Sequence, residues 1–196
     1  MILDMTMLAL FNASEFFQWF VENANYLFVF VFMTIESSFI PFPSEVVVPP
    51  AAYLACTGTD MNFGLVIVFA TLGALLGAFI NYYLALWIGR PIVYRFANSR
   101  FGHACLIDQA KVEKAEAYFE KKGAISTFVG RLIPAVRQLI SIPAGLARMN
   151  IGVFALFTTL GAGIWNIILA GLGYWLSLHV RREELFDAIE KYNSYL

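Results

Sequence analysis

The chain has 196 residues, of which 60% are hydrophobic and only 14% are charged, and its formal net charge is −1. This composition and a mean hydropathy of +0.69 lie well outside the range of soluble globular domains, which excludes that class. Residues 61–89 and 149–180 contain no charged residue, and each run exceeds the roughly 20 residues that a helix needs to cross about 30 Å of hydrocarbon. We therefore expect an all-α, multi-pass membrane protein with one membrane domain, residues 1–196.

The charges are divided unevenly along the chain. The first 89 residues carry six acidic residues and no Lys or Arg, and all 13 basic residues lie between Arg90 and Lys191. A carboxylate that is buried in the first half must therefore be neutralised by a proton or by a base from the second half.

The chain opens with an amphiphilic segment, residues 1–35, which forms either one transmembrane helix interrupted at Glu22 or an interfacial helix followed by a short span. The next segment, residues 36–57, is apolar but holds two carboxylates, Glu36 and Glu45, and several prolines. Proline interrupts a helix, and broken backbone at membrane depth is tolerated only where it is packed in protein or lines a wet cavity. We therefore expect a first re-entrant hairpin here. The prolines that shape it are Pro41, Pro43, Pro49 and Pro50.

A transmembrane helix over residues 62–89 leads into a water-facing connection, residues 90–123. Seven Lys and Arg residues lie in this connection, so the positive-inside rule places it in the cytoplasm. Asp108 can cap an amphipathic helix that ends at Gly123. We expect this helix to lie on the membrane surface.

A second proline-broken segment, residues 124–148, carries bases where the first carries acids. Its two central bases are Arg131 and Arg137, and we expect it to form a second re-entrant hairpin. The residues that shape this hairpin are Pro134, Pro143 and Gly145. The chain continues with a transmembrane helix, residues 150–178, and an interfacial tail, residues 181–196.

Four ionisable residues are the candidates for function, because a charge at membrane depth is costly and is rarely kept without a task. Arg131 and Arg137 stay protonated and offer planar forks that can hold a lipid phosphate. Glu36 and Glu45 can take protons near neutral pH in a low-dielectric site. Competition between phosphate and carboxylates for the same arginines would couple proton uptake to substrate release. In the alternative interpretation, the four residues form static ion pairs that hold the hairpins together.

The two halves of the chain repeat each other. Shifted by 88 residues, segment 62–74 aligns with segment 150–162, and with a further offset of five residues segment 50–55 resembles segment 143–147. If each hairpin returns to its own side, each unit crosses the membrane once and the units have opposite orientations, as in alternating-access carriers with inverted-topology repeats. This places the bases of the tail outside, against the positive-inside rule, but the seven bases of the connection outnumber them.

The second broken segment, from Phe128 through Arg131, Pro134 and Arg137 to Met149, resembles the signature of the DedA family, also called SNARE-associated or VTT-domain membrane proteins. The first broken segment is similar to the acidic re-entrant segment of that family. The resemblance implies re-entrant hairpins, a requirement for the proton-motive force, and translocation of undecaprenyl phosphate or of phospholipids. It also implies proton coupling by Glu36 and Glu45 and phosphate binding by the two arginines. In this chain the second acid lies within Pro-Ser-Glu, where relatives carry Gly or Asp variants.

We therefore expect a flippase of the bacterial cytoplasmic membrane that moves a lipid phosphate at the expense of the proton-motive force. The expected partners are a membrane lipid or polyprenyl phosphate and protons, not nucleic acid, and the sequence leaves a homo-oligomer open. No enzyme activity, cofactor or metal ion is expected, since no paired His nucleophile or cluster of metal ligands stands out. The alternatives are a proton-coupled small-ion or drug antiporter, which would use the carboxylates without the arginines, and a non-transporting membrane assembly factor.

Overall fold

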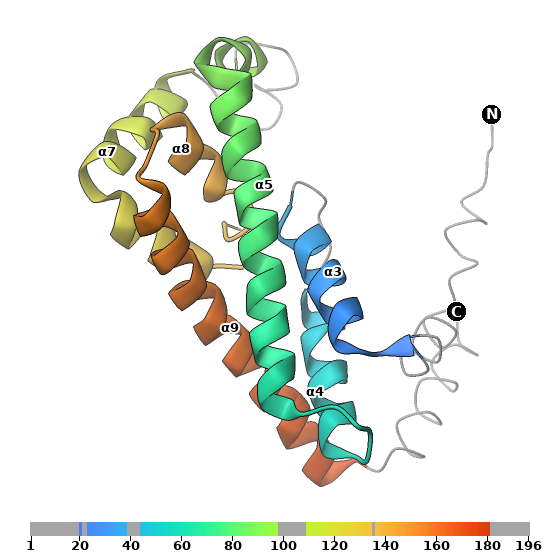
Figure 1. The fold of residues 1–196 in the computed structure, drawn as a ribbon. Helices are drawn as coiled ribbons and strands as arrows, with labels where there is room; N and C mark the ends of the chain where they lie inside the picture. The colour runs from blue at the N-terminus through green and yellow to red at the C-terminus, as the bar shows by residue number, and fades with distance from the viewer. Residues whose placement is uncertain (1–19, 21–22, 39–43, 98–108, 135, 181–196) are drawn as a thin grey trace, which may run out of the picture.

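The fold is known from a computed structural model, which describes residues 20, 23–38, 44–97, 109–134 and 136–180 (Figure 1). Within these residues, all regular secondary structure is helical, which confirms the expected all-α class. The elements are α3 (Tyr26–Glu36), η1 (Ser44–Val46), α4 (Val48–Cys56), α5 (Phe63–Ala97), α7 (Gln109–Arg131), α8 (Ser141–Leu146) and α9 (Ile151–His179). Pro41, Pro43, most of the N-terminal segment and the tail from residue 181 lie outside the described residues.

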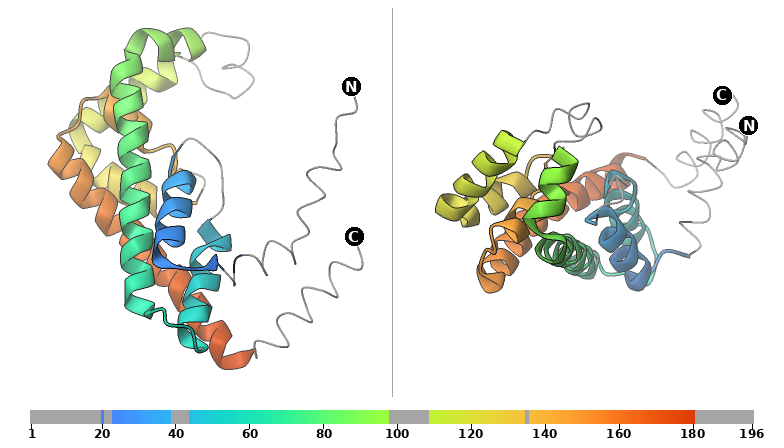
Figure 2. Two further views of the ribbon diagram at one scale, coloured as in Figure 1. Left: turned by 45° about the vertical axis from the view of Figure 1, so that its right-hand side comes forward. Right: turned by 90° about the horizontal axis from the view of Figure 1, so that it is seen from above.

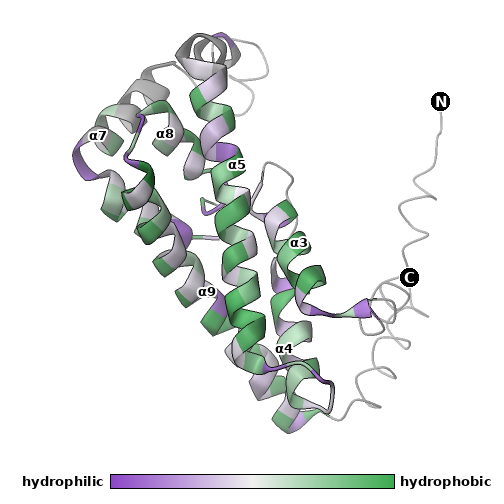
Figure 3. Ribbon diagram, in the orientation of Figure 1, coloured by the Kyte–Doolittle hydropathy of each residue, from purple (hydrophilic) through white to green (hydrophobic). Residues whose placement is uncertain are grey.

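Within the described residues, two helices are long and apolar enough to cross a membrane. They are the 25-residue part Phe63–Trp87 of α5 and the 29-residue helix Ile151–His179. Only 33% and 39% of their most apolar windows are buried inside the fold, so most of their apolar surface faces outward. Figure 3 shows hydrophobic residues along both helices. Such extended apolar exposure requires an apolar surrounding, which a lipid bilayer provides.

Both long helices begin with the same cap. The Asn62 side chain accepts hydrogen bonds from the backbone N–H groups of Gly64 and Leu65, at 2.9 and 3.2 Å. The Asn150 side chain, 88 residues later, accepts from Gly152 and Val153 at 3.0 and 3.2 Å. These bonds satisfy backbone donors that the first helical turn leaves unpaired.

The long helices change direction or end for different local reasons. α5 kinks at Gly89, whose φ of 70° belongs to the left-handed region, and continues as a short helix to Ala97. α7 has a non-helical residue at Lys122, which separates its first part from the part that ends at Arg131. α9 runs without such an interruption.

Each of the shorter helices packs on one of the two long helices, α5 or α9. α3 and α8 both lie along α5, whereas α4 and α7 both lie along α9 (Figure 2). One apolar core, which includes Val29, Tyr53 and Val66, joins α3, α4, α5 and α9. A second core, around Tyr82 and Phe154, joins α5, α7, α8 and α9. This arrangement brings Ser44, before α4, beside Arg137, before α8.

Candidate functional site

Charged and polar side chains from both halves of the chain meet in one small cavity. Its lining residues are Met33, Glu36, Ser37, Ala74, Arg131, Arg137, Ala162, Trp165 and Asn166. The cavity has a volume of about 10 Å³, which is room for one water molecule. A phosphate group is larger than a water molecule, so the site must open before it can admit one.

Two of the charged residues are the last residues of helices that end inside the fold. Glu36 ends α3 and Arg131 ends α7, and their exposed fractions are only 2% and 3%. Arg137 lies in the turns between α7 and α8 and is buried as well. Two helix ends and one turn thus bring three charged groups to the interior, where each needs compensation.

Arg137 connects the second half of the chain to the first. Its Nη2 lies 2.5 Å from Glu36 Oε1 and 3.7 Å from Glu45 Oε1. The same nitrogen donates a hydrogen bond to Ser44 Oγ at 2.6 Å. The Glu36 side chain is 2% exposed and the Glu45 side chain 47% exposed, so the two carboxylates have very different surroundings. A base from the second half therefore lies beside the buried acid of the first.

The Glu36 carboxylate is also held by its neighbour. Ser37 Oγ donates to Glu36 Oε2 at 2.7 Å. Asn81, in the middle of α5, donates to the carbonyl oxygens of Ser37 and Gln138 at 3.2 and 3.1 Å. This amide ties the backbones of both broken segments to the same long helix next to the ion pair.

Arg131 has no carboxylate partner among the described residues. Its Nη2 donates to Ser141 Oγ at 2.8 Å, and its Nε is buried without a hydrogen-bond partner. Glu36 attracts this guanidinium electrostatically but forms no ion pair with it, so the guanidinium keeps an unbonded N–H that an anion could accept. The arrangement can therefore accept an anion at Arg131 while Arg137 remains paired with Glu36.

The residues expected to shape the hairpins occupy several environments. Pro49 and Pro50 lie in the first turn of α4, where a missing N–H costs little. Pro134 is exposed in the turn after α7, and Pro143 lies within the first turns of α8. Gly145 packs so closely on α5 that an added Cβ would overlap the Tyr82 carbonyl oxygen.

Sequence reasoning missed several polar residues of the site. Ser37, Ser44 and Ser141 carry no signal in the sequence that separates them from other serines. Asn81 and Asn166 could have been found, because an amide in the middle of a long apolar helix is costly without a partner. Asn166 donates to Thr71 Oγ1 at 3.2 Å and so links α9 to α5.

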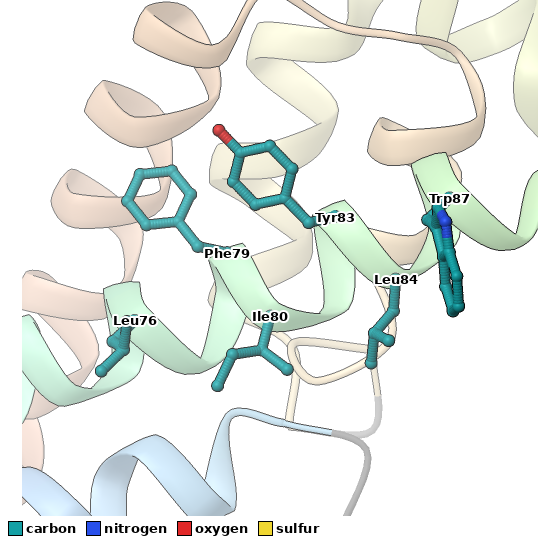
Figure 4. A pocket seen from close by; sticks show the side chains of 6 residues that line it. All are labelled: Leu76, Phe79, Ile80, Tyr83, Leu84 and Trp87. Atoms are coloured by element: carbon teal, nitrogen blue, oxygen red, sulfur yellow. The ribbon is translucent and has the colours of Figure 1, made fainter.

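A second hollow, elsewhere on the described surface, is apolar. It has a volume of about 590 Å³ and lies against α5 alone (Figure 4). The residues that line it are Leu76, Phe79, Ile80, Tyr83, Leu84 and Trp87. Because it is open and without charged groups, it belongs to the outward-facing apolar surface of the helix and not to the polar site.

The chain is similar to one protein family and to several known proteins. Residues 42–175 match the family model of the VTT domain. Undecaprenyl phosphate transporter A of Staphylococcus aureus is 30% identical over 158 residues, which cover 81% of this chain and 77% of the relative. The protein of the same name from Bacillus subtilis is 33% identical over 163 residues, 83% of this chain and 77% of the relative. An alkaline phosphatase-like protein of Lactococcus lactis subsp. cremoris is 36% identical over 153 residues, 78% of this chain and 71% of the relative. No solved structure matches the chain.

Proposed function

The chain belongs to the VTT-domain, or DedA, family of membrane proteins, and on this premise we propose that it moves a lipid phosphate across the bacterial cytoplasmic membrane. The proposed substrate is undecaprenyl phosphate or a phospholipid, and the proposed driving force is the proton gradient. The observation that carries the proposal is the arrangement of the buried arginines, of which Arg137 is paired with Glu36 and Arg131 has no carboxylate within ion-pairing distance among the described residues.

The proposed cycle begins with the two arginines in different states. The substrate phosphate first meets Arg131, whose guanidinium can offer it charge-assisted hydrogen bonds. A proton on Glu36 removes the charge that holds Arg137, so Arg137 turns to the phosphate. When Glu36 loses this proton to the other side, the carboxylate pairs with Arg137 again and the phosphate is released. Release therefore accompanies proton loss, which reverses the expectation from sequence that it accompanies proton uptake. Glu45 is half-exposed and 3.7 Å from the same guanidinium, which suits a group that passes protons between water and Glu36.

We also propose that residues 36–57 and 124–148 are re-entrant hairpins related by an inverted repeat. Two packing contacts support this. Ala52 of α4 packs on Gly173 of α9, and Ala85 of α5 packs on Gly145 of α8. The offset of 93 residues pairs Ala52 with Gly145, and the offset of 88 pairs Ala85 with Gly173. If the first unit is replaced by the second and the second by the first, the Ala52–Gly173 contact becomes the Ala85–Gly145 contact. A pseudo-two-fold axis would require this equivalence.

The site itself lies close to this proposed axis. Ser44 and Arg137 are related by the same offset of 93 residues, and they hydrogen-bond to each other. Residues that an axis relates can contact each other only near that axis. In carriers built from inverted repeats, the substrate binds at the interface between the repeats near the bilayer midplane, which is where the proposed phosphate site falls.

Transport by the reconstituted protein tests the proposal. Liposomes that contain the full chain and labelled undecaprenyl phosphate in one leaflet should move the lipid faster when a proton gradient is imposed. Arg131→Ala should lose most of this rate, because it removes the guanidinium that receives the phosphate. The matched control is Arg95→Ala, which removes an exposed arginine and should transport as the wild type does. Lipid movement at the wild-type rate by a folded Arg131→Ala protein would contradict the assignment of Arg131 as a phosphate-binding residue. Gradient-driven movement of a cationic dye by the same variant would favour an antiporter.

A further inference from the structure

Two buried hydrogen-bond donors in the polar cavity have no acceptor. They are Arg131 Nε and the indole Nε1 of Trp165, and both residues line the same cavity. Each of these groups can donate but cannot accept. Glu36 Oε1, on the same cavity, also lacks a hydrogen bond but is ion-paired with Arg137. Buried donors are nearly always satisfied in folded proteins, so two unbonded donors on residues that line one cavity indicate that it receives an acceptor.

Trp165 also contacts the arginine that changes partner in the proposed cycle. The Cζ of Arg137 lies 5.3 Å from the centroid of the Trp165 ring. A guanidinium over an indole face is attracted by the ring without needing a carboxylate. The ring can therefore keep Arg137 inside the cavity while Glu36 is protonated.

The two proposed repeat units carry different residues at the position of Trp165. A shift of 88 residues relates it to Gly77 of α5. At Gly77, an added Cβ would overlap the Thr34 carbonyl oxygen, so that position serves the close approach of α3. The bulky donor thus occurs only in the second unit, which also supplies both arginines.

We infer that Trp165 is a ligand of the substrate phosphate, to which its indole N–H donates a hydrogen bond beside Arg131 Nε. This inference rests on the proposed function and adds a residue of α9 to the site. A phosphate monoester has three terminal oxygens and can accept from Arg131, Trp165 and Arg137 at once. A single water, for which the closed cavity has room, has only two lone pairs to offer.

Binding by Trp165→Phe tests the inference, because phenylalanine keeps an aromatic ring and removes the N–H. The probes are undecaprenyl phosphate and undecaprenol, which share the same tail, and the protein is the full chain in nanodiscs. Trp165→Phe should weaken binding of the phosphate about tenfold or more, the effect expected for loss of one hydrogen bond to a charged group, and leave binding of undecaprenol unchanged. The matched control is Trp175→Phe on the same helix, where the side chain is 57% exposed; it should alter neither.

The outcomes separate the inference from the function on which it rests. If the wild type binds both lipids equally, the proposed function fails and the inference fails with it. If the wild type prefers the phosphate and Trp165→Phe keeps that preference, only the inference is overturned. If Trp165→Phe misfolds, a tryptophan analogue with sulfur in place of the indole N–H at position 165 preserves the shape, and an undiminished preference for the phosphate would again overturn the inference.

Discussion

At the scale of single residues, the two carboxylates beside Arg137 differ most in burial. Glu36 is almost completely enclosed, whereas about half of the Glu45 side chain is exposed. Removing one partner of a buried ion pair leaves an uncompensated buried charge, but an exposed pair is screened by water and contributes little. The stability of the fold should therefore depend on the first carboxylate and not on the second.

Glu36→Gln and Glu45→Gln form a matched pair that tests this difference. We expect Glu36→Gln to lower the free energy of unfolding by about 3–5 kcal/mol and Glu45→Gln to lower it by less than about 1 kcal/mol. Denaturant unfolding in detergent measures both. Adding Arg137→Gln to Glu36→Gln should recover part of the loss, since the unpaired charge is then gone. Equal effects of the two single variants would mean that the Glu36–Arg137 pair is not buried in the folded protein.

The charged residues of the site were predictable from sequence, whereas their neighbours were not. Glu36, Arg131 and Arg137 are conspicuous because charges within apolar, proline-broken segments are costly. The sequence does not show that Arg137 pairs with Glu36 whereas Arg131 bonds to Ser141, because these contacts depend on how the end of α3 and the segment after α7 pack together. Trp165 is one of many aromatic residues in the chain, and what distinguishes it is a buried, unbonded N–H on a residue that lines the cavity.

At the scale of the elements, close helix contacts depend on residues without a side chain. An added Cβ at Gly173 would overlap the carbonyl oxygen of Pro49 in α4, whereas one at Gly171, two residues earlier in α9, would meet nothing within 4 Å. Both glycines lie inside the same helix, so alanine gains the same intrinsic helix propensity at either position. The pair therefore isolates the packing of α4 on α9.

We expect Gly173→Ala to lower the free energy of unfolding by about 1–3 kcal/mol, since the backbone of α4 must move away. Gly171→Ala should be neutral or raise it by up to about 1 kcal/mol, because alanine favours the helix. Thermal unfolding of the two purified variants measures the difference. If both variants shift stability in the same direction, α4 does not pack on α9 as closely as the structure has it.

The long apolar helices were predictable, because uncharged runs of this length allow few other structures. Their ends were harder to place. Gly89 redirects α5 without ending it, because a left-handed residue can change the direction of a helix while regular structure resumes after it. The short helices α4 and α8 were not foreseen as helices, since their prolines suggested only a break; proline is in fact accommodated in a first helical turn.

At the scale of the whole molecule, the short helices α4 and α8 each pack on the long helix of the other proposed repeat unit. α4 lies along α9 and α8 lies along α5, so the units are interlocked around the polar cavity. The 88-residue repeat could be read from the sequence. The packing of α4 on α9 and of α8 on α5 could not, because it depends on contacts between residues far apart in the chain. It means that a shift of one unit against the other would separate Arg137 from Glu36 and open the closed site.

We propose that the Glu36–Arg137 ion pair couples lipid movement to proton movement. Vesicles that contain the full chain and an internal pH-sensitive dye, without an imposed gradient, test it when undecaprenyl phosphate is added to the outer leaflet. We expect a change of internal pH that accompanies lipid movement in the wild type and is absent in Glu36→Gln. Lipid movement by the wild type without any change of pH, or an unchanged proton flux in Glu36→Gln, would contradict it.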